Sequence, residues 1–380
     1  MIAVVSLGLP SQSKTVTSSS SKSATKRTDN SISSVKETLC VYDCLTGTKL
    51  GSHRMEGGIT AGLTADVARG IFTSRQNKAT TAAFAFGKEQ PSMRFAAPEP
   101  LEAIQFSSDA MYIVAGGLGN GMVYLWETET GQMLAAFKAH YRKVTCLAFT
   151  EDDTVLVTGG EDAMVHFWDF TSLVLHGSLG GNSSSSLLRT VSTCKTAISQ
   201  VSMLGLAGTT SSLAIASLDH TVRVVQLHNG NQVFAATLPT SLLSVCLDMD
   251  NVYAGGSNGS VYLVKDFATS ASANHVLTGH DGPVTCLRKI KPTELVSGSE
   301  DGTLRWWDTV TFAQLRMSKM EGACPVRGLV VLFDSDYVND LVKRKRRDTQ
   351  PLKKVKEAEQ WDRPALLTNF ESKPMVCFWE

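Results

Sequence analysis

Two histidines stand at matched distances from an aspartate and a tryptophan. His140 precedes Asp162 by 22 residues, His280 precedes Asp301 by 21, and in both segments a tryptophan follows the aspartate by six. A histidine paired with a carboxylate could act as a general acid–base couple. The chain has neither the G-x-x-x-x-G-K-[ST] phosphate loop nor the H-E-x-x-H zinc motif that would accompany such chemistry in two large enzyme classes. The repeated spacing therefore predicts a structural feature with no catalytic residues.

Other residues that could bind metals or act as nucleophiles are scattered. The eight cysteines, at positions 40, 44, 146, 194, 246, 286, 324 and 377, form no CxxC pair. Cys146, Cys246 and Cys286 occur in similar apolar contexts, which predicts buried positions on equivalent strands. The remaining histidines, His166 among them, form no cluster with ligand spacing along the chain. We predict neither a metal site nor a cofactor.

Two long segments resemble each other closely. Residues 140–169 and 279–308 each contain an apolar strand, a second strand that ends in small residues, an acidic turn and a Trp-Asp pair. Degenerate copies keep the six-residue step from turn to third strand, starting at Asn120, Asp219 and Asn258. This pattern resembles the WD-repeat family, whose unit of about 40–45 residues forms one four-stranded blade of a β-propeller. The sequence thus predicts an all-β fold with a single propeller.

The resemblance gives the repeated residues a structural role. In WD-repeat proteins a histidine, a serine or threonine of the second strand, the turn aspartate and the third-strand tryptophan form a buried hydrogen-bonded chain. The corresponding residues are His140, Thr158, Asp162 and Trp168 in one blade and His280, Ser297, Asp301 and Trp307 in another.

The number of blades depends on how the ring closes. Eight segments are candidates for third strands, ending near Tyr42, Phe84, Trp126, Trp168, Val225, Val264, Trp307 and Trp379. An open ring would leave sheet edges exposed, so strands from both chain ends should pair. If residues 2–7 and 39–42 complete a blade with 326–333, the ring has seven blades; if 364–379 form a blade of their own, it has eight. We favour seven.

Composition agrees with one large β domain and marks segments outside it. Hydrophobic residues make up 43% of the 380 residues, and 36 basic residues balance 36 acidic ones. The propeller is predicted over residues 1–335, with a disordered Ser/Thr-rich insert at 11–34 and an inter-blade loop at 173–195. Residues 336–362 are predicted to be a basic insertion, and residues 363–380 a terminal strand segment that packs on the propeller.

The basic insertion carries two charged clusters. They consist of Lys343, Arg344, Lys345, Arg346 and Arg347, and of Lys353, Lys354 and Lys356. This spacing is typical of a bipartite nuclear-import signal, and the same charges could contact RNA phosphates or simply keep a surface segment solvated. No secretory signal or stretch of eighteen apolar residues is present. We expect an intracellular protein with reduced thiols and no membrane contact.

A more specific resemblance covers roughly residues 39–335 and is weakest from 57 to 91. Residues 113–117, 124–131, 216–222 and 253–262 contribute to it, and a His140-Tyr141 pair stands where most blades have Gly-His. Together they resemble the WD-repeat subunit of the complex that processes the internal transcribed spacer of pre-rRNA and matures the large ribosomal subunit.

That resemblance implies a non-catalytic scaffold of the nucleus, found in the nucleolus and nucleoplasm. The partners implied are helical-repeat and armadillo-like scaffold subunits, a midasin-type ring ATPase and the pre-ribosomal particle, with direct RNA contact left open. Because propellers bind through loops, we predict a partner face around Tyr141 and Arg142 and the 173–195 loop.

The alternative is a substrate receptor of a cullin-type ubiquitin ligase, or another WD-repeat adaptor. Such receptors typically carry an arginine two residues after a Trp-Asp pair. Thr171 and Val310 occupy those positions here, which disfavours this alternative.

Overall fold

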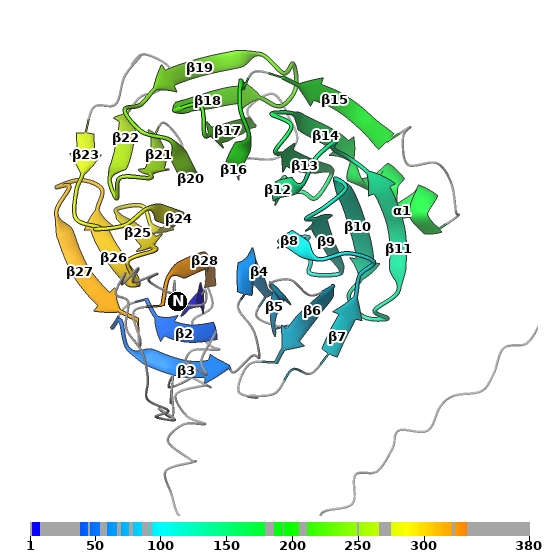
Figure 1. Ribbon diagram of the computed structural model, residues 1–380, viewed down its shortest axis with the longest axis horizontal. Helices are drawn as coiled ribbons and strands as arrows, with labels where there is room; N and C mark the ends of the chain where they lie inside the picture. Colours follow the sequence, from blue (N-terminus) through cyan, green and yellow to red (C-terminus); the bar gives the residue numbers. More distant parts are fainter. Residues whose placement is uncertain are drawn as a thin grey trace, which may run out of the picture.

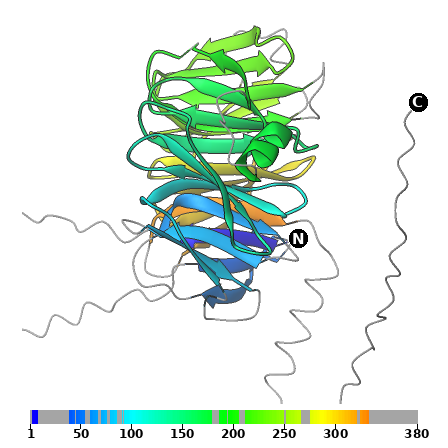
Figure 2. The same cartoon turned by 90° about the vertical axis from the view of Figure 1, so that its right-hand side faces the viewer.

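The computed structural model shows a ring of β-sheets around a central axis (Figure 1) and a flat disc in the perpendicular view (Figure 2). The residues that it describes are 2–7, 39–44, 46–53, 59–66, 70–75, 79–85, 91, 93–178, 186–192, 194–204, 211–248, 251–265, 275–320 and 324–332. They form seven four-stranded antiparallel sheets and one helix. The predicted all-β propeller with seven blades is confirmed.

We number the blades in ring order and give their strands from the axis outward. Blade 1 contains β4 Ile59–Asp66, β5 Gly70–Arg75, β6 Thr80–Phe84 and β7 Met93–Ala96. Blade 2 contains β8 Leu101–Phe106, β9 Tyr112–Gly117, β10 Met122–Glu127 and β11 Met133–Lys138. Blade 3 contains β12 Val144–Phe149, β13 Val155–Gly160, β14 Val165–Asp169 and β15 Leu187–Val191, with helix α1 Phe170–Ser178 before β15.

The remaining four blades complete the ring. Blade 4 contains β16 Ile198–Leu204, β17 Ser212–Ser217, β18 Thr221–Gln226 and β19 Gln232–Thr237. Blade 5 contains β20 Leu242–Leu247, β21 Asn251–Gly256, β22 Val261–Lys265 and β23 His275–Leu277. Blade 6 contains β24 Val284–Lys291, β25 Glu294–Ser299, β26 Thr303–Asp308 and β27 Gln314–Lys319. Blade 7 contains β28 Val326–Leu332, β1 Ile2–Leu7, β2 Leu39–Asp43 and β3 Lys49–His53.

Blade 7 closes the ring with strands from distant parts of the chain. Strand β1 pairs antiparallel with β28 on one side, Val4 opposite Val330, and with β2 on the other, Val4 opposite Val41. The side chains of Val4 and Val5 are fully buried. This arrangement satisfies the sheet edges that an open ring would expose, and it matches the seven-blade prediction.

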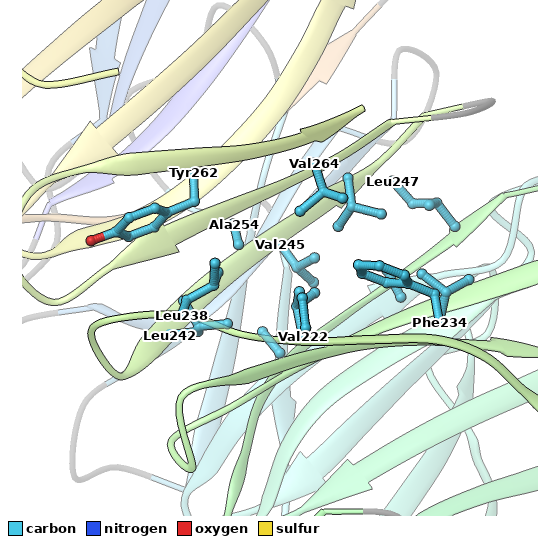
Figure 3. Packing of buried hydrophobic residues seen from close by; sticks show 14 residues of the cluster. Val222, Phe234, Leu238, Leu242, Val245, Leu247, Ala254, Tyr262 and Val264 are labelled. Atoms are coloured by element: carbon cyan, nitrogen blue, oxygen red, sulfur yellow. The ribbon is translucent and has the colours of Figure 1, made fainter. Parts of the chain in front are cut away.

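Burial changes from the axis to the rim and explains the strand patterns. The second strands have small and β-branched residues on both faces and are buried almost completely, as in β13, where all six residues are buried. The fourth strands alternate buried and exposed residues, as in β19, because only one face meets a neighbouring blade. Between blades 4 and 5, Val222 and Phe234 of one sheet pack against Val245, Leu247 and Val264 of the next (Figure 3). Inter-blade apolar layers of this kind form the core.

The structure corrects the prediction of a long loop at 173–195. Residues 170–178 form α1, and 187–191 form β15, the outer strand of blade 3. Helix α1 begins after Asp169, whose carboxylate accepts the hydroxyl of Ser172 at 2.5 Å, and it buries Phe170 and Leu173. The prediction failed because β15 is largely exposed and carries no apolar alternation. The insert at 11–34 and the segments 336–362 and 363–380 lie outside the described residues.

Candidate functional site

In blade 3 the structure brings together the four side chains singled out by their spacing. Nε1 of Trp168 donates to Oγ1 of Thr158 at 3.1 Å, and Nε2 of His140 lies 2.9 Å from the same oxygen. Nδ1 of His140 lies 3.0 Å from Oδ1 of Asp162. Because an indole can only donate, the threonine hydroxyl is free to donate to Nε2, and Nδ1 then donates to the carboxylate. We call this chain of hydrogen bonds the blade 3 tetrad.

Blade 6 repeats the arrangement with serine in place of threonine. Nε1 of Trp307 donates to Oγ of Ser297 at 2.8 Å, Nε2 of His280 lies 2.7 Å from that oxygen, and its Nδ1 lies 3.0 Å from Asp301. The carboxylate of Asp301 also accepts the amide of Thr303 at 2.8 Å, which fixes the turn between β25 and β26. Each tetrad therefore links the segment before the first strand of its blade to the second and third strands by hydrogen bonds.

Electrostatics favour neutral histidines and ionised aspartates in both tetrads. Burial lowers the pKa of His140 and of His280 below the usual value of 6.5. Burial opposes ionisation of Asp162, but hydrogen bonds from the Tyr141 amide and from His140 outweigh it and lower the pKa of this carboxyl. Both ring nitrogens of each histidine are engaged in hydrogen bonds that join the segments of its blade.

Degenerate blades use other polar contacts at the same place. In blade 2, Glu99 replaces the histidine and accepts the amide of Gly119 at 3.1 Å and the hydroxyl of Tyr124 at 3.1 Å. In blade 4, Asp219 pairs with Arg223 at 3.4 Å, with both side chains buried. The polar contacts at this position therefore differ between the tetrad blades 3 and 6 and the degenerate blades 2 and 4.

The predicted partner residues lie directly above the blade 3 tetrad. The Tyr141 amide donates to Oδ2 of Asp162 at 3.0 Å, yet its side chain is 83% exposed. Arg142 is also exposed, and the Lys138 ammonium lies 5.8 Å from the centre of the Tyr141 ring. A rigid backbone thus presents an aromatic and a cationic side chain to solvent, a combination enriched at protein interfaces.

The same face surrounds the mouth of the central channel. A cavity of about 270 Å³ there is lined by residues of several blades, including Leu218, Glu161 and Thr285. Two ion pairs bridge neighbouring blades around it, Lys143 with Glu102 at 3.4 Å and Arg327 with Glu300 at 3.0 Å. We define the interaction face as Tyr141 and Arg142 together with these cavity residues and the four residues of the two ion pairs.

Nucleophilic chemistry finds little support in the described residues. Burial raises the pKa of the Cys146 thiol to about 12 and that of Cys286 to about 11, so both remain protonated thiols. Residues 255–259 match the G-x-S-x-G pattern of serine hydrolases. They form the hairpin turn between β21 and β22, whereas the hydrolase pattern requires a turn from strand to helix.

One side-chain cluster was missed by reasoning along the sequence. His166 brings its ring centre to 4.6 Å from that of His140, and donor atoms of these two histidines and Asp162 all lie within 4.8 Å of one another. Strand register would have revealed this, because His166 stands directly opposite Thr158 of the tetrad. Spacing alone does not show it.

The two basic clusters at 343–347 and 353–356 lie outside the described residues, so their predicted roles in import or phosphate contact stay predictions. No helix of the described part of the chain has the length and apolar character needed to cross a bilayer.

Family models and known proteins match parts of this chain. The WD domain, G-beta repeat family matches residues 272–308, and the WDR54 family matches residues 95–187. WD repeat-containing protein 18 of Danio rerio is 30% identical over 284 residues, which cover 70% of this chain and 64% of that protein. The pre-rRNA-processing protein crb3/ipi3 of Schizosaccharomyces pombe is 27% identical over 61% of this chain and 60% of its own length.

A solved structure supports the fold alone. The computationally designed protein Ika8 superposes with a TM-score of 0.59 at 21% identity, over 78% of this chain and 85% of that one. The chain spans less than two thirds of the length of the first curated relatives that it matches. The chain is a seven-bladed β-propeller with a WD repeat at residues 272–308, and it is similar to WD repeat-containing protein 18 and to the pre-rRNA-processing proteins crb3/ipi3 and IPI3.

Proposed function

We propose that this protein is a non-catalytic scaffold in ribosome biogenesis, which acts in pre-rRNA processing and in maturation of the large ribosomal subunit precursor. The observation that carries the proposal is the similarity to two yeast proteins whose names assign them to pre-rRNA processing. Two features of the geometry support a scaffold role. The polar side chains of the tetrads hydrogen-bond to one another, and the Tyr141 backbone is fixed by Asp162 while its side chain is exposed.

The partners proposed are helical-repeat and armadillo-like scaffold subunits, a midasin-type ring ATPase and the pre-ribosomal particle. Tyr141 and Arg142 would contribute an aromatic anchor and a hydrogen-bonding cation to the scaffold contact. The clusters 343–347 and 353–356 supply the charge for nuclear import or for RNA phosphates. A nuclear location, in the nucleolus and nucleoplasm, follows from this proposal.

Tagged-protein purification followed by mass spectrometry, together with measurement of pre-rRNA intermediates after depletion, tests the function. Recovery of large-subunit assembly factors and accumulation of precursors that retain the internal transcribed spacer are expected. Recovery of cullin adaptors with normal pre-rRNA would contradict the proposal and favour a ubiquitin-ligase receptor.

The interaction face is tested separately with the double variant Tyr141→Ala, Arg142→Ala. We expect loss of scaffold recovery with an unchanged unfolding transition, since both side chains are exposed. A matched control changes the exposed pair Met133→Ala, Leu315→Ala on the rim strands β11 and β27. If the face variant recovered as much scaffold as the rim variant and the unchanged chain, binding would use another surface.

A further inference from the structure

The cluster of His140, Asp162 and His166 has the composition of a metal site that the sequence did not predict. Two imidazoles and a carboxylate are a donor set that suits Zn²⁺ and neighbouring divalent ions of the first transition row. All three residues come from blade 3: His140 precedes β12, Asp162 lies in the turn after β13, and His166 lies on β14.

The distances place the three donors near coordination geometry. Nδ1 of His140 is already 3.0 Å from Asp162, and the most distant donor pair of the cluster is within 4.8 Å. A tetrahedral Zn²⁺ with bonds of about 2.0–2.1 Å separates its ligands by about 3.3 Å. His140 is buried and His166 is half-buried, so His166 is the ligand with more room to move toward the other two.

Hydrogen bonds orient the ligands in the way that protein metal sites require. Nδ1 of His166 lies 2.8 Å from the Thr190 hydroxyl of β15, so Nε2 is the nitrogen left for a metal. Nε2 of His140 is held by Thr158, which leaves Nδ1 facing the carboxylate. The metal would take the place of the single proton that Nδ1 shares with Asp162, and Nε2 would then carry the ring proton and donate to Thr158.

Blade 6 supplies an internal comparison. Its tetrad has the same histidine and aspartate, but the residue opposite Ser297 is Arg305 rather than a histidine. A guanidinium cannot coordinate a cation, because it has no lone pair to offer and carries its own charge. The two tetrads thus differ at the position that completes the donor set, and also in the turn, where the Thr303 hydroxyl of blade 6 lies 3.0 Å from Nδ1 of His280 and blade 3 has Met164.

We propose that His140, Asp162 and His166 form a Zn²⁺ site on blade 3, with the fourth position open to water or to a partner side chain. The site lies beneath the interaction face, because Asp162 also accepts the Tyr141 amide. The proposal is independent of the function proposed above.

Titration of the full-length chain with Zn²⁺ against a chelating dye, and with Co²⁺ by visible absorption, tests the site. The unchanged chain should bind one more tight equivalent of Zn²⁺ than His166→Gln. In that variant the affinity for Zn²⁺ at this site should be at least about 10-fold lower. A spectrum of nitrogen and oxygen ligation is expected for Co²⁺. Circular dichroism and the thermal transition of each variant verify folding.

The converse double variant Arg305→His, Thr303→Met gives blade 6 the missing ligand and the turn residue that blade 3 has at Met164, and it should gain one equivalent. Equal Zn²⁺ binding by His166→Gln and the unchanged chain would overturn the proposal, as would a Co²⁺ spectrum of thiolate ligation only. A double-variant chain that binds no more than the unchanged chain would overturn the geometric argument.

Discussion

The backbone carbonyl of Gly121 accepts the amide of His140 at 3.0 Å, so that a turn of blade 2 holds the first residue of the blade 3 tetrad. The amide of Ala139 donates to the same carbonyl at 2.9 Å. Met320 and Gly302 make the corresponding contact at 2.8 Å between blades 6 and 7. Adjacent blades are therefore coupled by backbone hydrogen bonds as well as by apolar packing.

Substitution of Gly121 should be far more costly than that of a comparable turn glycine. Gly121 has φ +69°, and a Cβ there would collide with the carbonyl oxygens of His140 and Arg142. We expect Gly121→Ala to lower the free energy of unfolding by about 3–5 kcal/mol and to weaken scaffold recovery. Gly131, at φ +71° with its nearest neighbour atom 3.4 Å away, is the control and should lose only about 1–2 kcal/mol. Equal losses in urea unfolding would contradict the steric argument.

The tetrad hydroxyl is expected to contribute measurably to stability. Thr158→Val keeps the side-chain shape but leaves Nε2 of His140 and Nε1 of Trp168 without their shared partner. Two buried polar groups left unsatisfied should cost about 2–4 kcal/mol. Thr237→Val on the exposed rim of β19 is the control, with no loss expected. A Thr158→Val transition as stable as that of the control would show that the tetrad adds no net stability.

Closure of the ring by β1 can be tested by removal and restoration of that strand. A chain that starts at residue 9 should expose the edges of β2 and β28, melt at a lower temperature and associate as its concentration rises. A peptide with residues 1–8 should restore the melting temperature, because it supplies the missing ladder. A scrambled peptide serves as the control. Unaltered melting of the shortened chain would mean that β1 is dispensable for closure.

Stability should decline in mild acid because of the tetrad histidines. The pKa of His280 is lower in the folded chain than in the unfolded one, so unfolding takes up a proton. Stability is therefore full above about pH 6.5 and is lost as pH falls toward the folded pKa. Urea unfolding between pH 7.5 and 5 should show this slope, and His280→Gln should reduce it. The exposed His228→Gln is the control; a slope unchanged in His280→Gln would refute the assignment.

Local relationships could be predicted from the sequence, and relationships across strands could not. The step of six residues from Asp162 to Trp168 lies within one hairpin, so spacing was enough to indicate which residues meet. The need to satisfy sheet edges predicted that β1 and β28 would share a blade. The proximity of His166 to His140 depends on strand register, which the sequence alone left undefined.

The outer parts of the blades were predicted least well for the same physical reason. Fourth strands such as β15 face solvent, so their sequences carry no apolar period to mark them. Helix α1 replaced a predicted loop because its buried residues, Phe170 and Leu173, pack against a neighbouring blade that the sequence does not identify. Blade 1 was indicated only near Phe84, which lies on its third strand.

The shared strand of blade 7 also sets an order of events during synthesis. At about 5–20 residues per second, β28 leaves the ribosome roughly 15–65 seconds after β1. Throughout that interval β1 has no inner neighbour, while the other six blades can pair strand by strand as they emerge. Final closure is therefore a late, long-range step, and the nascent chain depends on protection of its first strands until then.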